Sequence, residues 1–194
     1  FEKNKPQHWG LEVQLNYDQM VERSDEDLFD EQGFPISSQG ISFDPSVGFL
    51  IGGVYQYNPV KWLGLQSGLG LRGIFAYRDL GFRNPGGYRN VLFARIPLNV
   101  QARPVHWFAL EGGFNLHLYL LHNDSYQSNN DIRANDFESL YIDWQAGMRF
   151  WLVENFSLGA AINYNMRPIA TSPVGYNLDI AHLNLNLRYM WPLK

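Results

Sequence analysis

The feature that most constrains the fold of this chain is an alternation of apolar and polar residues that recurs eight times. It is clearest from Leu140 to Phe150, where Leu, Ile, Trp, Ala, Met and Phe alternate with Tyr, Asp, Gln, Gly and Arg. Successive side chains of a β-strand point to opposite faces, so a period of two predicts strands with one apolar and one polar face. Eight strands are predicted, at about 9–17, 45–57, 62–78, 92–103, 108–120, 140–150, 156–164 and 182–191.

The connections between the predicted strands alternate between short and long. Tight turns are expected at 58–62, 103–107 and 152–156, and long polar loops at about 21–44, 79–90, 122–138 and 168–179. An internal repeat aligns Pro59–Leu71 with Pro104–Leu116, so the repeating unit is a hairpin. Short turns at one end and long loops at the other are typical of outer-membrane β-barrels.

Composition helps to decide which face of the strands is outside. A soluble sheet normally covers its wet face with Lys and Glu. The four lysines of this chain lie at the termini or in a turn, at Lys3, Lys5, Lys61 and Lys194. Glycines on the polar face are expected to relieve crowding inside a narrow barrel; these are Gly64, Gly68, Gly70, Gly113, Gly147 and Gly159. A lipid-facing apolar surface is therefore favoured over a soluble sandwich or a lipocalin-like barrel.

The expected fold is all-β, with residues 1–194 forming a single domain. It is an eight-stranded antiparallel up-and-down transmembrane β-barrel with short periplasmic turns, long extracellular loops and both termini periplasmic. The start at Phe1 predicts an exported protein with a cleaved signal peptide. The absence of Cys excludes disulfides and thiolate chemistry. A net charge of −4 without a basic tract argues against a nucleic-acid partner.

The polar face predicts a plugged interior. Eight strands leave a space that side chains fill, and buried charges are tolerated when they are paired and hydrogen-bonded. We expect an ionic plug rather than an open channel, with a narrow polar conduit as the alternative. The expected interior cluster comprises Glu12, Arg72, Arg95, Arg103, Glu111, His117, Asp143, Arg149, Arg167 and Arg188.

Two further sets of residues point to surfaces. Aromatic residues at one level predict a membrane-interface girdle of Trp9, Trp62, Trp107, Phe156 and Trp191. The first long loop holds an apolar group expected to contact the barrel mouth or a partner: Leu28, Phe29, Phe34 and Ile36. The same loop is acidic, with Glu22, Asp25, Glu26, Asp27, Asp30 and Glu31. Its spacing matches no calcium loop, so a solvated loop is expected, and neither a metal nor a cofactor is predicted.

Enzymatic chemistry is a weaker alternative. His117, with His122, Ser125, Ser139 and Asp143, offers a base, a nucleophile and an orienting acid. A hydrogen-bonding role for His117 in the interior is the simpler interpretation. We therefore expect a protein that is not an enzyme.

Three segments resemble the PorT-like outer-membrane β-barrel family of Bacteroidetes-type bacteria, which are OmpA- and OmpX-like eight-stranded barrels. They are Arg95-Ile96-Pro97-Leu98-Asn99-Val100, Leu110-Glu111-Gly112-Gly113 and the closing segment 185–191. The resemblance covers about 45–194. It implies an outer-membrane location and, through the namesake, a link to protein secretion. Pro97 lacks a donor for the barrel ladder, so a local β-bulge is expected there.

We therefore expect a non-enzymatic accessory or scaffolding subunit of an outer-membrane export, secretion or envelope-assembly complex. Its expected partners are outer-membrane lipid, lipopolysaccharide and other outer-membrane proteins. The alternatives are a free-standing barrel that binds a ligand or surface partner through its loops, a small-solute pore and a lipid-modifying enzyme.

Overall fold

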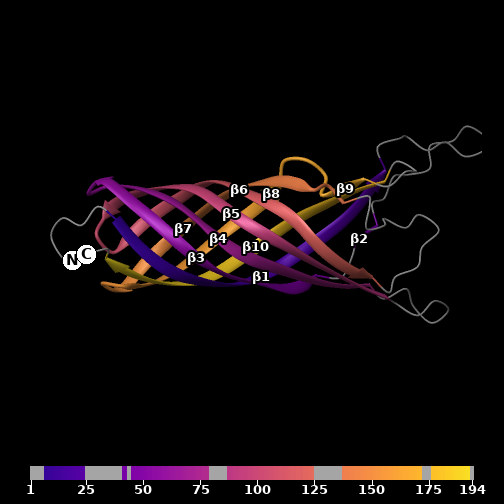
Figure 1. The fold of residues 1–194 in the computed structure, drawn as a ribbon, viewed down its shortest axis with the longest axis horizontal. Coiled ribbons are helices and arrows are strands. Elements are labelled where there is room, and N and C mark those ends of the chain that lie inside the picture. The colour runs from indigo at the N-terminus through magenta and orange to yellow at the C-terminus, as the bar shows by residue number, and fades with distance from the viewer. Residues whose placement is uncertain are drawn as a thin grey trace, which may run out of the picture.

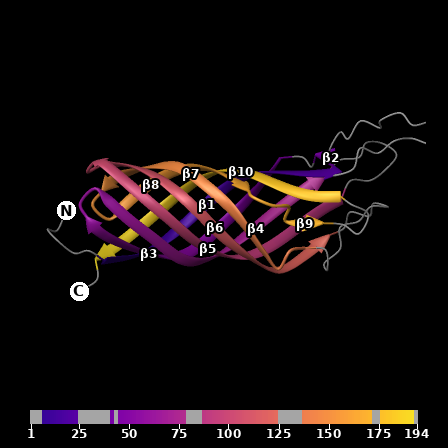
Figure 2. The same ribbon diagram turned by 90° about the horizontal axis from the view of Figure 1, so that it is seen from above.

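The computed structural model describes residues 7–24, 41–42, 45–78, 87–124, 137–171 and 176–192. Long tilted strands coil around one axis, and the start of β1 and the end of β10 lie together at one end (Figures 1 and 2). Eight strands are long. They are β1 (Gln7–Ser24), β3 (Ser46–Val60), β4 (Leu63–Arg78), β5 (Gly87–Val105), β6 (Phe108–Asp124), β7 (Leu140–Val153), β8 (Phe156–Asn165) and β10 (Tyr176–Pro192). Two short strands are β2 (Ile41–Ser42) and β9 (Ala170–Thr171). No helix long and apolar enough to cross a membrane occurs among these residues.

The long strands form a closed antiparallel barrel, as predicted. Each pairs with its neighbour along the chain, and β1 pairs with β10 to close the ring. The short strands extend this closing pair, since β2 pairs with β1 at Val21–Ser42 and β9 pairs with β10 at Leu178–Ala170. Closure pairs the strand edges around the ring, which a membrane-spanning sheet requires.

The pairing register fixes the stagger of the barrel. One circuit of paired residues starts at Trp9 on β1 and returns to β1 ten residues further on. It runs through Tyr55, Ser67, Leu98, Phe114, Trp144, Tyr164, Ala181 and Gln19. With a rise of about 3.3 Å per residue and about 4.8 Å between strands, this stagger gives a tilt of about 40°. That tilt matches outer-membrane barrels.

The two ends of the barrel differ, as the connection lengths predicted. At the end that holds the termini, here called the turn end, two-residue turns join β3 to β4, β5 to β6 and β7 to β8. The longer connections leave the opposite end, here called the loop end.

The three turns share one geometry, in agreement with the hairpin repeat. The register shifts just before each turn, between Tyr57 and Val60, between Ala102 and Val105, and between Trp151 and Val153. A turn carbonyl then accepts a hydrogen bond from the next hairpin in each case. The N–H groups of Arg103, Trp151 and Met190 donate to the carbonyls of Trp62, Trp107 and Asn155 at 2.7, 2.9 and 2.7 Å.

The expected bulge at Pro97 is wrong. The β4–β5 pairing stops at Ser67–Leu98 and resumes at Gly70–Arg95, so two residues are left unpaired on each strand and the register is unchanged. The β5–β6 pairing is continuous through Pro97–Asn115. The missing donor of Pro97 therefore falls in a two-residue gap of the β4–β5 ladder, opposite Gly68.

The inward glycines mainly allow strands to approach one another. A Cβ on Gly68 would lie 2.3 Å from the carbonyl oxygen of Gly53, and one on Gly113 would lie 2.2 Å from that of Leu98. These obstacles are backbone atoms of neighbouring strands. At Gly159 the obstacle is instead an interior side chain, the amide oxygen of Asn186 at 2.6 Å. The expected relief of interior crowding thus holds at Gly159 and at Gly64, where a Cβ would meet the side chains of Asn58, Gln101 and Gln56. Gly68 and Gly113 instead allow neighbouring strands to approach closely.

Gly113 and its neighbour Gly112 offer a matched test. Gly113→Ala is expected to lower the free energy of unfolding by about 1–3 kcal/mol, since backbone must shift to admit the methyl group. Gly112 faces outward, where a Cβ would meet only the carbonyl of Gln145 at 3.7 Å. Gly112→Ala is expected to be neutral or to stabilise by about 0.5 kcal/mol. Urea unfolding in lipid vesicles measures both, and equal losses would contradict the close approach at Gly113.

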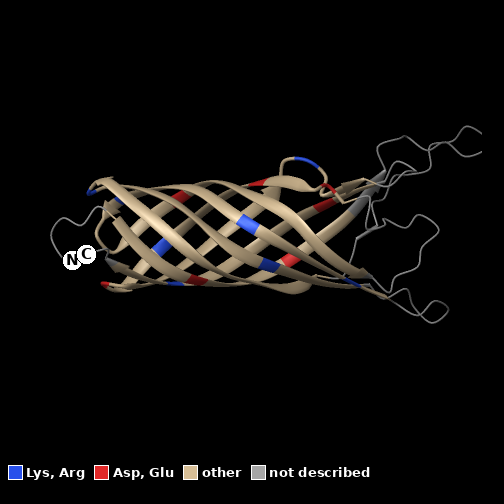
Figure 3. Cartoon of the chain, in the orientation of Figure 1, with Lys and Arg blue, Asp and Glu red and all other residues tan. Residues whose placement is uncertain are grey.

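The two faces of the barrel wall have opposite character. Outward residues are apolar and exposed, for example Leu11 (56%), Leu15 (61%) and Leu69 (63%). Along β6 the outward apolar positions run from Leu110 to Leu120, ten steps along a tilted strand, which gives an apolar band about 25 Å tall. Charged residues occupy few positions along the strands (Figure 3). An exposed apolar surface of this extent is a lipid-facing surface.

Candidate functional site

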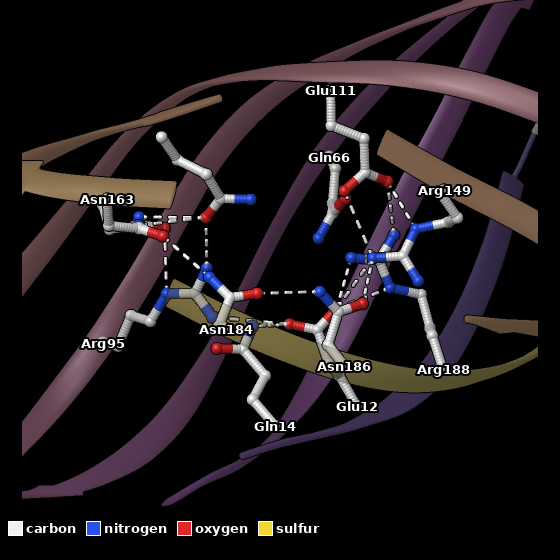
Figure 4. A network of polar contacts seen from close by, with 12 residues as sticks. Glu12, Gln14, Gln66, Arg95, Glu111, Arg149, Asn163, Asn184, Asn186 and Arg188 are labelled. Atoms are coloured by element: carbon white, nitrogen blue, oxygen red, sulfur yellow. Dashed lines mark hydrogen bonds and ion pairs between the residues drawn. The ribbon is translucent and has the colours of Figure 1, made fainter. Parts of the chain in front are cut away.

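Two buried carboxylates, Glu12 and Glu111, are the centres of the polar network in the half of the interior nearer the turn end. Glu12 on β1 is the first (Figure 4). Its Oε2 accepts from Arg188 Nε at 2.7 Å and also from Arg188 Nη2. Arg149 Nη2 lies 3.5 Å from the same oxygen, and Arg95 Nη1 donates to Oε1 at 3.4 Å. Glu12 is 1% exposed, so three guanidinium groups share one buried carboxylate.

Glu111 on β6 is the second carboxylate. Arg149 binds it through two nitrogens, with Nε donating to Oε1 at 2.5 Å and Nη2 to Oε2 at 3.2 Å. Arg188 Nη1 reaches Oε1 at 3.5 Å, and Gln101 Nε2 donates to the same oxygen at 2.6 Å. Arg149 and Arg188 therefore each contact both carboxylates. These ion pairs link β1, β6, β7 and β10 across the interior of the barrel. Two-nitrogen arginine–carboxylate pairs are among the strongest polar contacts in proteins.

A second polar group lies above the first, toward the loop end. Arg72 on β4 donates to Asp18 Oδ1 at 2.8 Å and to the Tyr141 hydroxyl at 2.9 Å, and it lies 2.9 Å from His182 Nδ1. Asp143 lies 2.8 Å from His117 Nε2 and accepts from Asn115 Nδ2 at 2.5 Å. The His117 ring stacks on Tyr141 at 4.3 Å. This group extends the plug to mid-barrel.

The loop end is closed by apolar side chains rather than by charges. We call this group the apolar cluster: Met20, Ile74, Ala76, Val91, Phe93, Phe137, Tyr141, Ile169, Ala170, Leu178 and Ile180. Its roof consists of Phe137 and Ile169, which lie between strands, and Ala170 at the start of the short strand β9. Glu138 N–H donates to the Ile169 carbonyl at 3.0 Å, and Ile169 N–H to the Leu178 carbonyl at 2.8 Å. This cluster was not predicted from the sequence.

Most residues of the expected interior cluster meet in the barrel. Eight of them are at most 5% exposed: Glu12, Arg72, Arg95, Glu111, His117, Asp143, Arg149 and Arg188. Arg103 is half-buried at the turn end, where its guanidinium lies 4.6 Å from the centre of the Trp151 ring. The prediction for Arg167 is wrong, because β8 ends at Asn165 and Arg167 is exposed.

Sequence reasoning also missed interior residues. His182, on the polar face at the start of the last predicted strand, is buried but was left out of the expected cluster. Asp18 and Arg89 are buried too, and they lie beyond the ends of the predicted strands. Continuing the alternation by a few residues would have found them, since each keeps the inward parity of its strand.

The expected aromatic girdle lies on the outer surface near the turn end. Trp9, Trp62, Trp107 and Trp191 are between 40% and 61% exposed, and Phe156 is half-buried. Trp9 pairs with Trp191 across β1 and β10. The ring centres of Trp9 and Tyr55 are 5.3 Å apart, and those of Trp107 and Phe150 are 6.2 Å apart. Tyr55 and Phe150 are thus girdle residues that the sequence analysis left out.

The residues considered for catalysis do not form an accessible site. His117 and Asp143 are in contact, but both are at most 1% exposed and lie below the apolar cluster. His122 lies 2.9 Å from the Tyr119 hydroxyl through Nδ1, and Ser139 is exposed at the rim. Ser125 lies outside the described residues. A hydrogen-bonding role for His117 is the one the geometry supports.

The predictions for the first loop cannot be placed. Leu28, Phe29, Phe34 and Ile36 lie outside the described residues, as does the acidic stretch 25–31. Glu22 belongs to β1, but its side chain is not described.

A lipid-facing apolar wall, a paired polar interior and an aromatic girdle define the class of this protein, an eight-stranded β-barrel of the outer-membrane type. Comparison with solved structures agrees on the fold. Neisserial surface protein A has a TM-score of 0.53 at 13% identity, covering 92% of this chain and 96% of that chain. For AlkL the values are 0.51, 14%, 100% and 94%, and for OprG from Pseudomonas aeruginosa 0.50, 14%, 95% and 97%. At these identities the likeness concerns the fold alone.

Comparisons of sequence do not add a family. No protein-family model matches the chain, and no curated protein matches it. The resemblance to the PorT-like family is therefore not confirmed.

Proposed function

We propose that this barrel is a non-enzymatic component of an outer-membrane assembly, in which it serves as an accessory or scaffolding subunit. In this proposal the turn end faces the periplasm, and the loops form the contact surface outside. An export, secretion or envelope-assembly complex is the kind of assembly that the PorT-like segments indicate.

The observation that carries this proposal is the double closure of the interior. The paired Glu12 and Glu111 groups cross the barrel near the turn end, and the apolar cluster covers its loop end. Among the described residues, these two groups occupy the interior near both ends, which argues against a solute route and against access of a substrate to His117. The surfaces left for function are therefore the lipid-facing wall and the ends. The first loop adds Leu28, Phe29, Phe34 and Ile36, which are too apolar for a bare solvent loop.

Extraction of native membranes with mild detergent tests the proposal. A tag on the C-terminus, mass spectrometry and native-gel sizing identify what the chain carries with it. The expected result is a large complex with a fixed ratio of subunits. A particle of the 22.4 kDa chain plus detergent alone would overturn the subunit role.

A loop variant supplies the matched control for that experiment. Phe29→Ser combined with Phe34→Ser is expected to release the partner while the barrel stays folded, as shown by its heat-modifiable gel mobility. A complex that survives this change would place the contact elsewhere and contradict a docking role for this apolar loop group.

Planar bilayers test the closed interior directly. The wild-type chain is expected to give no large, well-defined conductance steps, because the arginine–carboxylate network fills the barrel. Such steps would favour the small-solute pore.

A further inference from the structure

The outward face of the barrel is taller on one side than on the other. On β4 the outward positions run from Leu63 to Tyr77, fourteen residues apart, and all of them are uncharged. On β1 the outward apolar positions run from Trp9 to Tyr17, eight residues apart, and the next outward residue is Gln19. The same type of wall therefore extends six residues further on β4 than on β1, which corresponds to about 15 Å along the barrel axis.

The taller side exceeds the thickness of the lipid that surrounds it. Fourteen residues of a strand tilted by about 40° span about 35 Å along the axis, whereas the apolar band of outer-membrane barrels is about 25 Å tall. β5 has the same span, from Ala102 to Tyr88. Tilting the barrel raises one side as it lowers the other and leaves each span almost unchanged. Since Trp62 of the girdle fixes the turn end of β4, about 10 Å of this side projects beyond the lipid at the loop end.

Five exposed side chains cover the projecting surface, here called the upper patch. Tyr77 pairs directly with Tyr88 across β4 and β5. A register shift pairs Leu92 with Leu121 but Phe93 with Tyr119, so Leu120 is an extra residue on β6 and both leucines are exposed. Such bulges redirect side chains. The patch consists of Phe75, Tyr77, Tyr88, Leu120 and Leu121, which are between 41% and 54% exposed.

The composition of the upper patch distinguishes it from an aromatic girdle. Tyrosines suit the interface because a ring with a polar tip can lie between lipid and water. Phe75, Leu120 and Leu121 have no polar tip, and three such side chains outside the lipid form an apolar surface that another surface can cover. Phe75 also stacks on Phe49 of β3, with ring centres 5.7 Å apart, which holds this part of the wall in place.

A second copy of the chain matches this surface in height and in charge. Two copies inserted into one membrane in the same orientation carry the upper patch at the same height, so a two-fold axis along the membrane normal brings the patches together. Such an axis also places each residue near its own copy, which would set like charges against each other. The outward positions of β4 and β5 between the residues named above carry no charge, whereas β10 on the opposite side has Asp179 at an outward position.

We propose that the upper patch is a self-contact surface, through which two copies of this chain form a two-fold dimer in the membrane. Below the patch the two walls can touch as well, but contact there replaces lipid of similar polarity and contributes little. The free energy of association therefore comes from the part that projects beyond the lipid. The dimer goes beyond the proposed subunit role and does not depend on it.

Single-molecule photobleaching of the purified, tag-labelled chain in phospholipid vesicles tests the dimer at a large excess of lipid. The wild-type chain is expected to bleach in two steps. Tyr77→Ser combined with Leu121→Ser is expected to weaken the dimer about tenfold, because two apolar side chains leave the contact. A wild-type chain that bleaches in one step at every density overturns the self-contact.

Tyr17→Ser combined with Leu183→Ser is the matched control. These two residues pair across β1 and β10 on the short side of the barrel, and they are 54% and 49% exposed. The control is expected to dimerise as the wild type does, with heat-modifiable gel mobility showing that both variants are folded. An equal weakening in the control would show that the contact is not at the upper patch and would overturn the proposal.

Cross-linking provides a second measurement that needs no serine variant. The chain has no Cys, so one substitution supplies one reactive position. With a short bifunctional maleimide in vesicles, Tyr77→Cys is expected to form linked pairs severalfold faster than Tyr17→Cys. Equal rates at the two positions would mean random collision and would contradict a contact through the upper patch, even if the serine variants do not fold.

Discussion

Replacing Glu12 by alanine is expected to lower the free energy of unfolding by about 3–5 kcal/mol, the cost of breaking a buried ion pair by removing one partner. Glu12 accepts from Arg188 Nε at 2.7 Å and from Arg95 Nη1 at 3.4 Å, and Arg149 lies 3.5 Å away. Without Glu12, Arg149 and Arg188 must share Glu111, and among the described side chains Arg95 keeps only the amide oxygens of Asn115 and Gln145. The loss therefore arises from uncompensated buried charge rather than from one missing hydrogen bond.

Urea unfolding in lipid vesicles measures this loss. Glu154→Ala is the control, since Glu154 lies in the exposed turn between β7 and β8 and its removal is expected to change stability by about 0.5 kcal/mol or less. Glu12→Leu combined with Arg188→Leu removes one charge of each sign and is expected to recover part of the loss. A loss below about 1 kcal/mol for Glu12→Ala would contradict the role of Glu12 as the centre of the ionic network.

The strands and their faces could be predicted because lipid outside and hydrogen-bonding groups inside impose opposite chemistry on alternate residues. The segment Leu140–Phe150 shows this contrast at every step, and the structure gives the expected faces. The alternation within one strand does not say which of its residues pair with which residues of the neighbouring strand. That Glu12 faces Arg188 across β1 and β10 depends on which residues pair, and a period of two leaves this open.

The loop end could not be predicted for a different physical reason. The apolar cluster puts apolar residues on the inward face where the outward face is apolar as well, so the alternation loses its contrast. Ile74 and Ala76 lie inward between outward Phe75 and Tyr77, and Phe93 lies inward beside Leu92. The predicted strands 62–78 and 92–103 contain these positions, but a sequence read for polar interiors does not mark them as inward.

Several contacts of the interior also skip a strand. Arg72 on β4 reaches Asp18 on β1 across β3, where Gly48 and Gly52 leave the inward side open. A Cβ on Gly48 would lie 2.2 Å from Asp18 Oδ2. The glycines were correctly assigned to the polar face in the neighbouring strands, but which side chains they let meet depends on the closed barrel.

Phe93→Ala is expected to cost about 3–5 kcal/mol, as does removal of other fully buried aromatic side chains. Phe93 is 0% exposed in the apolar cluster, with ring centres 5.0 Å from Tyr141, 6.1 Å from His117 and 6.2 Å from Tyr119. Backbone hydrogen bonds from Glu138 to Ile169 and from Ile169 to Leu178 hold the roof, so it cannot collapse far into the space left behind. A cavity term therefore adds to the loss of apolar burial.

Phe114→Ala is the matched control for this prediction. Phe114 faces outward on β6 with 49% exposure, and lipid chains can occupy the space that its ring leaves. The expected loss is about 2 kcal/mol or less, the transfer term alone. Urea unfolding of both variants in the same lipid measures the difference, which isolates the packing of the cluster. Equal losses would mean that the cluster is no better packed than a lipid contact, and the closure of the loop end would then have no structural basis.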